Sequence, residues 1–420
     1  DAREALNVLL EQGGSLPWTQ FSRQYGEVRS MGPARRDRER PDLHPQSPTE
    51  TLWYYGLLGQ AFLDQPPEPQ QYAYIPEDLL ALIHAPQLQP AGVYGRPASP
   101  AETVVIYPTS DRILDHACTL LAARRTGIPD EQIPMPGWQI PLPDLQALLT
   151  AAGLLDGSGL PLPEPTRLFL EAPRAEALLQ LASAWLHSPL YNELRLLPGL
   201  ICEGDWENDP LFARTRLIEH LSRLPQGNWW NLSAFLADLK QNDPDFQRPA
   251  GDYDSWFIRR ARDGQFLSGF ASWDEVDGAL ARRMICGQLH WLGFLDLAAP
   301  SASAPASAFR PSAWSANLWK EQPPVGLPDE TSIINVYSDG RIEVPRLTQR
   351  ALRYNLARFA DWEAESEDGY AYRITPASLN RAHRQGLRPA QLASLLKKHA
   401  RALPPTLLTA LERWQQHGTE

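Results

Sequence analysis

Proline occupies 40 of the 420 positions in this chain, roughly twice its usual share of about 5%. Proline lacks a backbone N–H and fixes its φ angle, so it ends helices and does not fit central strands. The composition therefore favours many short helices with rigid connections over long helices or wide sheets. With 43% apolar and 21% charged residues, the chain also has enough material to form folded cores.

One layout recurs three times: an amphipathic helix, a glycine, two large apolar residues, and a helix restart led by proline. The glycines are Gly56, Gly153 and Gly293. Such an exit indicates a small β-hairpin after each helix. A single copy would be better explained as an ordinary helix end in an all-α protein, but three copies favour a repeated unit. With helices upstream, this is the layout of a winged-helix domain, and the copy around Gly153 fits it less well.

We therefore predict a mainly α-helical chain of tandem winged-helix-like units followed by a small α/β unit. The expected units are residues 1–85, a degenerate unit at 110–200, a unit with an insertion at 210–320, and the α/β unit at 331–420. In the first unit, Ser47 is suited to cap a third helix over residues 48–63, with Pro48 in its first turn. That helix has no basic residue, which argues against ordinary reading of DNA bases by it.

The charge of the chain is unevenly distributed. The net charge is −11, yet residues 331–420 hold 13 Lys and Arg against 9 Asp and Glu, so this unit carries +4 and the rest −15. Any contact with nucleic acid should therefore be local. The alternative for helically spaced charges is a solvated helix face. The candidate nucleic-acid contacts are Arg346, Arg350, Arg353, Arg381, Arg384, Arg388, Lys397 and Lys398.

A secondary basic loop lies before the helix expected at Pro48. Its arginines alternate with Glu27, Asp37 and Glu39, so internal salt bridges or a protein interface are favoured over phosphate contact. The loop contains Arg29, Arg35, Arg36, Arg38 and Arg40.

Several classes of site are absent from the sequence. No Gly-Lys pair occurs, which excludes a phosphate-binding loop, and H-E-x-x-H, paired C-x-x-C and G-x-S-x-G are also missing. The three cysteines are far apart, which argues against a disulfide framework or a paired metal site. The chain shows neither an 18-residue apolar stretch nor a signal-peptide layout. We expect a cytoplasmic, non-enzymatic protein with no catalytic residues, cofactor, metal or membrane contact.

The C-terminal unit carries a family resemblance in the order INVYSDGRIEVP, ARFADWE, YAYRITPASLNRAHRQGLRPAQLASLLKKHA and LPPTLLTALERW. This order of turn, strand and proline-led helix starts resembles the N-terminal domain of XPB-type helicases. It more closely resembles a group of bacterial standalone proteins with that domain. The first part, from GGSLPWTQFSRQYGEVRSMGP to YIPEDLLALI, resembles the start of the same bacterial proteins. The resemblance implies helicase-associated binding to DNA or to a helicase, polymerase or other subunit, without motor domains. It also implies a further segment after Glu420.

Two functions follow from these observations. The first is a non-catalytic DNA-binding accessory protein in transcription, repair or defence. The second is a protein interaction scaffold whose winged helices dock partner subunits without touching DNA. The tandem winged helices and the basic C-terminal unit support the first function. The −15 balance of the first 330 residues, the third helix without arginine and, if several are exposed, the 14 tryptophans support the second, since tryptophan is enriched at binding hot spots. A hydrolase with two scattered carboxylates ranks far behind both.

Overall fold

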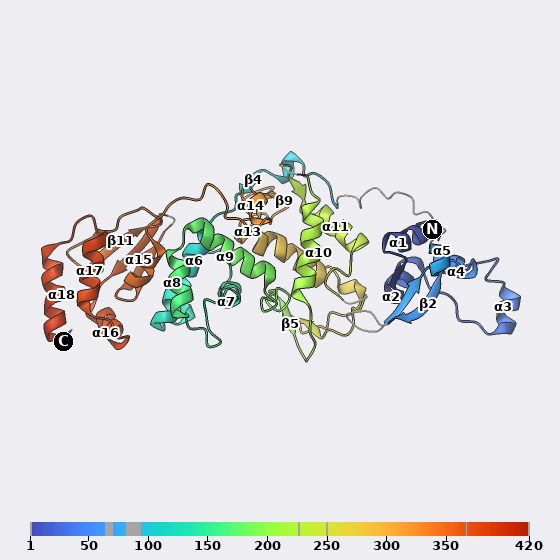
Figure 1. The fold of residues 1–420 in the computed structure, drawn as a ribbon, viewed down its shortest axis with the longest axis horizontal. Coiled ribbons are helices and arrows are strands. Elements are labelled where there is room, and N and C mark those ends of the chain that lie inside the picture. The colour runs from blue at the N-terminus through green and yellow to red at the C-terminus, as the bar shows by residue number, and fades with distance from the viewer. Residues whose placement is uncertain are drawn as a thin grey trace.

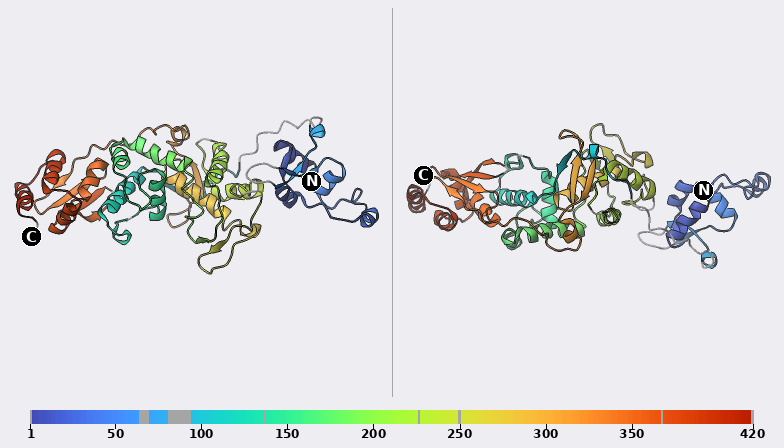
Figure 2. Two further views of the ribbon diagram at one scale, coloured as in Figure 1. Left: turned by 60° about the horizontal axis from the view of Figure 1, so that its bottom comes forward. Right: turned by 90° about the horizontal axis from the view of Figure 1, so that it is seen from above.

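The chain forms an elongated molecule with its N-terminal and C-terminal units at opposite ends of a central body (Figures 1 and 2). The computed structural model describes residues 2–63, 70–80, 94–135, 137–225, 227–248, 251–366 and 368–418. The N-terminal unit comprises residues 2–80, the central body 94–322 and the C-terminal unit 334–418, within these described ranges.

The N-terminal unit packs short helices against a three-stranded antiparallel sheet of order β1–β3–β2. Its core contains Leu9, Phe21 and Leu52, which are at most 3% exposed. The elements are α1 (Ala2–Glu11), β1 (Ser15–Pro17), α2 (Trp18–Tyr25), α3 (Pro33–Glu39), α4 (Pro48–Tyr54), β2 (Gly59–Leu63), β3 (Gln70–Tyr74) and α5 (Glu77–Leu80).

The start of α4 confirms the predicted cap, because the Ser47 side chain accepts a hydrogen bond of 2.9 Å from the Glu50 backbone N–H. The predicted end at residue 63 is wrong: α4 ends at Tyr54, and Gly56 turns the chain with a φ of 71°. The chain then enters the β2–β3 hairpin, which is present as expected. Residues 81–85 of the predicted first unit lie outside the described residues.

The central body is built from many short elements around one hydrophobic cluster that extends from Ile113 to Leu318. The units predicted at 110–200 and 210–320 share this core. The elements are η1 (Pro100–Glu102), β4 (Val105–Tyr107), α6 (Arg112–Thr126), η2 (Asp130–Gln132), α7 (Leu142–Ala151), α8 (Pro163–Glu171), α9 (Arg174–His187), β5 (Leu200–Cys202), α10 (Pro210–Ser222), β6 (Trp230–Asn231), α11 (Leu232–Asn242), β7 (Ile258–Arg260), η3 (Phe270–Ser272), α12 (Asp277–Arg283), the π-helical turn η4 (Met284–Gln288), α13 (Leu289–Trp291), β8 (Leu295–Ala299), β9 (Ala308–Pro311) and α14 (Ser315–Leu318).

Of the two hairpins expected in the central body, one is present and the other is reduced to a single bridge. After Gly293, β8 and β9 form the predicted hairpin, and β4 and β6 extend it to a four-stranded sheet of order β4–β8–β9–β6. After Gly153, only a single antiparallel bridge forms, between Leu155 and Pro161. A separate two-stranded ribbon pairs β5 with β7.

The C-terminal unit packs its helices on a four-stranded antiparallel sheet of order β10–β11–β13–β12. The turn at Ser338, Asp339 and Gly340 connects β10 to β11, as the sequence predicts. The elements are β10 (Asn335–Val336), β11 (Arg341–Pro345), α15 (Arg350–Ala357), β12 (Asp361–Glu365), β13 (Gly369–Arg373), α16 (Pro376–Arg384), α17 (Pro389–His399) and α18 (Pro405–His417).

The fold class differs from the prediction of a mainly α-helical chain of tandem winged-helix-like units. The protein is a mixed α/β protein, 45% helical and 14% strand, with four small sheets. The prediction was wrong because β4, β5, β6 and β7 are only two or three residues long and pair across long sequence distances. Such segments are too short to show a two-residue periodicity. No helix in the described part of the chain is long and apolar enough to cross a membrane.

Candidate nucleic-acid interface

Most of the basic residues of the C-terminal unit lie in the segment that contains its last three helices. Residues 376–418 contain seven Lys and Arg and a single acidic residue, Glu412. The acids of the sheet are paired locally instead, with Asp339 and Glu363 on Arg373 and Asp361 on Arg381. Helices α16, α17 and α18 also lie at the free end of the elongated molecule (Figure 1). Apart from that of Arg381, their charge is therefore left for solvent or a ligand.

Capping fixes how the basic helices begin. The Thr375 hydroxyl accepts the Ser378 backbone N–H at 3.0 Å, and Pro376 occupies the first turn of α16. At the next helix start, Pro389 occupies the first turn of α17, and the Arg388 backbone N–H donates to the Gln391 side chain at 2.7 Å. These starts place Arg388 at one end of α17, whereas Lys397 and Lys398 lie in its last turn.

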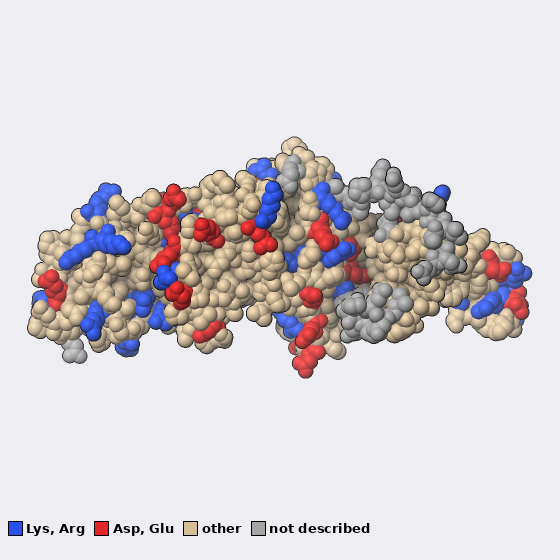
Figure 3. All heavy atoms as spheres, viewed as in Figure 1, with Lys and Arg blue, Asp and Glu red and all other residues tan. Residues whose placement is uncertain are grey.

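Four of the predicted contacts are exposed, and we call this set the basic face: Arg384, Arg388, Lys397 and Lys398. Within the described residues, none of the four has an ion pair. Arg388 and Lys398 line an open hollow along one side of α17, together with Gln391 and Ser394. In Figure 3, basic side chains outnumber acidic ones over the C-terminal end of the molecule. This geometry suits phosphate oxygens, which Arg and Lys bind through charge-assisted hydrogen bonds.

Arg381 lies beside this face but differs from it in being partnered. Its guanidinium makes an ion pair of 2.8 Å with Asp361 and donates to the Ala360 carbonyl oxygen at 3.2 Å. Its side chain is 25% exposed. The structure therefore places Arg381 at the edge of the basic face with its charge already balanced.

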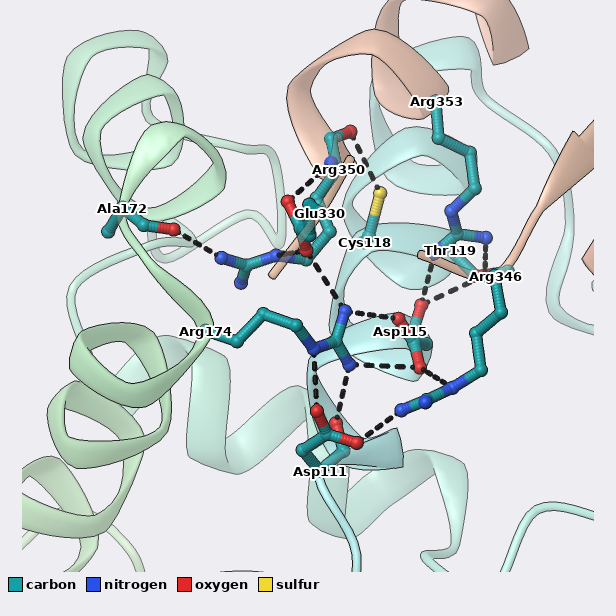
Figure 4. A network of polar contacts seen from close by, with 10 residues as sticks. All are labelled: Asp111, Asp115, Cys118, Thr119, Ala172, Arg174, Glu330, Arg346, Arg350 and Arg353. Carbon is teal, nitrogen blue, oxygen red and sulfur yellow. Dashed lines mark hydrogen bonds and ion pairs between the residues drawn. The ribbon is translucent and has the colours of Figure 1, made fainter. Parts of the chain in front are cut away.

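The other three predicted contacts point into the molecule. Arg350 and Arg353 are buried, at 1% and 2% exposed, and the side chain of Arg346 is 19% exposed. All three meet the central body where α15 packs against α6 and α8 (Figure 4). Their placement on a solvated or DNA-facing helix surface is thus corrected. Helical spacing shows only that charges share a face, whereas the acids of the central body decide which face is covered.

This buried cluster, the seam network, joins four arginines to three carboxylates. Arg174 of α9 contacts Asp111 at 2.6 Å, Asp115 at 3.0 Å and Glu330 at 2.9 Å. From the C-terminal unit, Arg346 pairs with Asp115 at 2.8 Å and also with Asp111. The members are Asp111, Asp115, Arg174, Glu330, Arg346, Arg350 and Arg353.

The remaining two arginines of the seam network bind one carboxylate and several neutral groups. Arg350 pairs with Glu330 at 2.7 Å and donates to the Ala172 carbonyl oxygen at 2.6 Å. Arg353 donates to the Thr119 hydroxyl at 2.8 Å, and its guanidinium lies 3.9 Å from the centre of the Tyr370 ring. The network therefore spans both bodies.

Electrostatics in the seam network favour the charged forms of Asp111 and Arg174 despite their burial. Burial alone would raise the pKa of the Asp111 carboxyl, but Arg174 and Arg346 outweigh it and lower that pKa. Burial would likewise lower the pKa of Arg174, but Asp115 and Asp111 raise it. Such a network contributes less to net stability than to a defined geometry, since desolvation offsets much of the attraction. It connects the C-terminal unit to the central body.

The secondary basic loop is largely occupied by internal ion pairs. Arg29 binds the fully buried carboxylate of Glu50 at 2.9 Å, and Arg35 binds Glu39 at 2.6 Å. Arg40 pairs with Asp42 at 2.9 Å. Arg36 and Arg38 of α3 have no ion pair among the described residues. The predicted internal salt bridges are confirmed, and a protein interface at α3 stays a prediction.

The comparison with known families concerns the C-terminal unit. Residues 334–419 match the family model described as the helicase conserved C-terminal domain. The match includes every element from β10 to α18, and so contains both the basic face and the α15 side of the seam network. The C-terminal unit is therefore similar to a helicase domain. No curated protein matches the chain.

Sequence reasoning missed the central-body half of the seam network. Asp111, Asp115 and Arg174 are separated from Arg346 by 172 to 235 positions, and no short motif connects them. Only the unusual abundance of arginine, a residue suited to buried ion pairs, is a sequence signal for such a network. Within the described ranges, no group of three or more His, Cys, Asp or Glu is placed to hold a metal ion.

Proposed function

We propose that this helicase-associated protein binds nucleic acid through the basic face of α16 and α17. The observation that supports this function is the set of four exposed, unpaired cations on a segment with one acid against seven bases. The resemblance of the same unit to the N-terminal domain of XPB-type helicases supports DNA as the ligand. Contacts of this kind position a phosphate backbone and carry no base sequence information.

The proposed role is non-catalytic. The chain contains no Gly-Lys pair and thus no phosphate-binding loop with its lysine. The purified chain should release no phosphate from ATP above the background of a mock preparation, with or without DNA. Turnover that copurifies with the chain through a second, orthogonal column would contradict this part of the proposal.

The test replaces Arg384, Arg388, Lys397 and Lys398 by alanine and measures affinity for duplex and single-stranded DNA over a range of salt concentrations. Each lost phosphate contact on duplex DNA reduces the salt slope by about 0.9, so the variant should lose up to about 3.6 units. The loss should be alike for unrelated sequences. Circular dichroism should report an unchanged fold, because exposed charges contribute little to stability.

The matched control removes four exposed charges from the rest of the chain, by alanine substitution of Arg36, Arg38, Arg223 and Arg262. It changes net charge by the same amount but leaves the basic face intact. Equal loss of affinity in both variants would show that only overall charge matters. Absence of salt-dependent retention in the intact protein at low ionic strength would remove nucleic acid as the ligand.

A second candidate function, docking of a protein partner, is favoured by one surface on the central body. Phe257 and Phe266 are 57% and 53% exposed and lie edge to face, 6.4 Å between ring centres, beside the β5–β7 ribbon. Acidic side chains gather on the projection near β5 (Figures 1 and 3). Arg259 lies over the Phe266 ring and pairs with Glu203, so charges of both signs border the aromatic patch, which fits a partly apolar protein surface.

This second function has its own test. Replacement of Phe257 and Phe266 by serine should abolish capture of a purified helicase subunit while leaving DNA retention unchanged. Capture that persists in this variant but fails in the variant lacking the basic face would contradict docking at the ribbon.

A further inference from the structure

A cavity of about 270 Å³ lies between the central body and the C-terminal unit. It opens between α6, α8 and α15, and Arg125, Thr166, Tyr354 and Arg358 are among its lining residues. Its volume is just below the roughly 300–1,000 Å³ of typical small-molecule sites. The cavity is therefore the size of a small ligand or of one group of a larger ligand.

Two arginines of this cavity have no acidic partner. Among the described residues, neither Arg125 nor Arg358 forms an ion pair, and the Arg358 Nε is buried without a hydrogen-bond partner. A third arginine, Arg167, is already held by Glu164 at 2.6 Å and Glu171 at 2.5 Å. A buried donor without a partner is costly, which makes the Arg358 guanidinium a group that a ligand can satisfy.

The electrostatics of the cavity show that its polar groups act on one another. Burial lowers the pKa of Arg358, and the positive charge of Arg125 lowers it further. Burial raises the pKa of the Tyr354 phenol, whereas Arg358 and Arg125 act in the opposite direction. The cavity lining thus holds three guanidinium groups, one phenol hydroxyl and one carboxylate, that of Glu171, which leaves an excess of positive charge. An anion would relieve both the repulsion and the burial of charge.

We propose that this cavity binds a phosphate group, carried either by a nucleic-acid strand or by a small phosphorylated molecule. Guanidinium groups match the oxygens of phosphate in bidentate geometry, and the Tyr354 hydroxyl supplies a further donor to a group with several oxygens. Since α15 belongs to the C-terminal unit and α6 to the central body, a bound phosphate bridges the two bodies. The site does not depend on the basic face of α16 and α17.

The first test measures binding of inorganic phosphate to the full chain by isothermal titration calorimetry at constant ionic strength. Arg125→Gln and Arg358→Gln should each weaken binding about tenfold or more, because each removes a charge-assisted interaction with the anion. The control Arg413→Gln removes an exposed charge on α18, away from the cavity, and should bind phosphate as the parent chain does. Arg125 is exposed on α6, so its variant stays informative if Arg358→Gln folds poorly.

The second test distinguishes the source of the phosphate. A nucleoside 5′-monophosphate is compared with its nucleoside, and a short single-stranded oligonucleotide is titrated alongside. Binding of the monophosphate alone assigns a small phosphorylated molecule, and tighter binding of the oligonucleotide assigns a strand. In either case, loss in Arg125→Gln supports the site, and the variant lacking the basic face must retain phosphate binding. Equal phosphate affinity in the parent, Arg125→Gln and Arg358→Gln chains would overturn the proposal, as would no saturable binding of phosphate.

Discussion

Two sets of basic residues in the same C-terminal unit have opposite environments. The arginines at positions 346, 350 and 353 enter the seam network, whereas Arg384, Arg388, Lys397 and Lys398 remain exposed and unpaired. Both sets recur at helical spacing, and both lie in the helicase-associated segment. The difference arises from what packs against each helix. Helix α15 contacts α6 and α8 of the central body, whereas α16 and α17 lie at the free end of the molecule.

Acids that are remote in sequence determine whether an arginine of this unit is buried and paired or stays exposed. Asp111, Asp115 and Glu330 supply three carboxylates to α15 and its neighbours. Residues 376–418 contain only Glu412 to do the same for the last three helices. A buried arginine with partners holds two bodies together, and an exposed arginine without partners is free to bind a ligand.

The largest effect is expected when an arginine of the buried set is removed. Arg350→Ala removes the guanidinium that binds Glu330 and the Ala172 carbonyl oxygen, and it opens a cavity against Phe169. Breaking a buried pair on one side typically costs about 3–5 kcal/mol, so the free energy of unfolding should fall by about that amount. Urea denaturation followed by circular dichroism measures it.

The control for this prediction is Arg384→Ala, the same substitution on the exposed set. Its unfolding midpoint should coincide with that of the parent chain. If Arg350→Ala and Arg384→Ala unfold at the same urea concentration, the seam network does not hold the C-terminal unit in place.

The next effect is a loss of stability at acid pH, which we expect from a buried histidine of α6 and not from the exposed cations. His116 of α6 stacks on Trp138 with ring centres 4.4 Å apart, and burial lowers its pKa to about 4. Because the folded pKa lies below the ordinary value of about 6.5, His116 contributes stability above pH 6.5 that is lost as the pH falls toward 4. Between pH 7 and pH 5, the free energy of unfolding should fall by roughly 2 kcal/mol from this group.

His116→Phe keeps an aromatic ring beside Trp138 and removes the titration. Urea unfolding at pH 7 and pH 5 should therefore show a smaller difference for the variant than for the parent chain. An identical pH dependence in both chains would show that His116 is not the group that senses acid.

The sequence predicted local features better than it predicted which face of each helix is buried against another element. The Ser47 cap, the turn at Gly340 and the hairpins after Gly56 and Gly293 are local and were predicted correctly. The fold class was wrong because it depends on short strands paired over long distances. The basic face was identified as a candidate set, but its division from the buried arginines depends on which side of α15 meets α6. No pattern within α15 contains that information.

The smallest expected effect lies at the boundary between the two sets, at Arg381. Its ion pair with Asp361 balances its charge, so Arg381→Ala should change the salt slope of DNA binding by much less than Arg384→Ala. The latter should lower the slope by about 0.9, the value for one phosphate on duplex DNA. Salt titrations of the two single variants, with the same duplex, measure the difference.

Removal of the acid instead of the base reverses the expectation. Asp361→Asn takes the charge from the partner of Arg381, so that Arg381 joins the unpaired set at the edge of the basic face. The salt slope should then become steeper, by at most the 0.9 or so of one further phosphate, and Arg381→Ala in this background should restore the parent value. A slope that stays constant in Asp361→Asn would mean that pairing with an acid is not what separates the buried arginines of α15 from the exposed cations of α16 and α17.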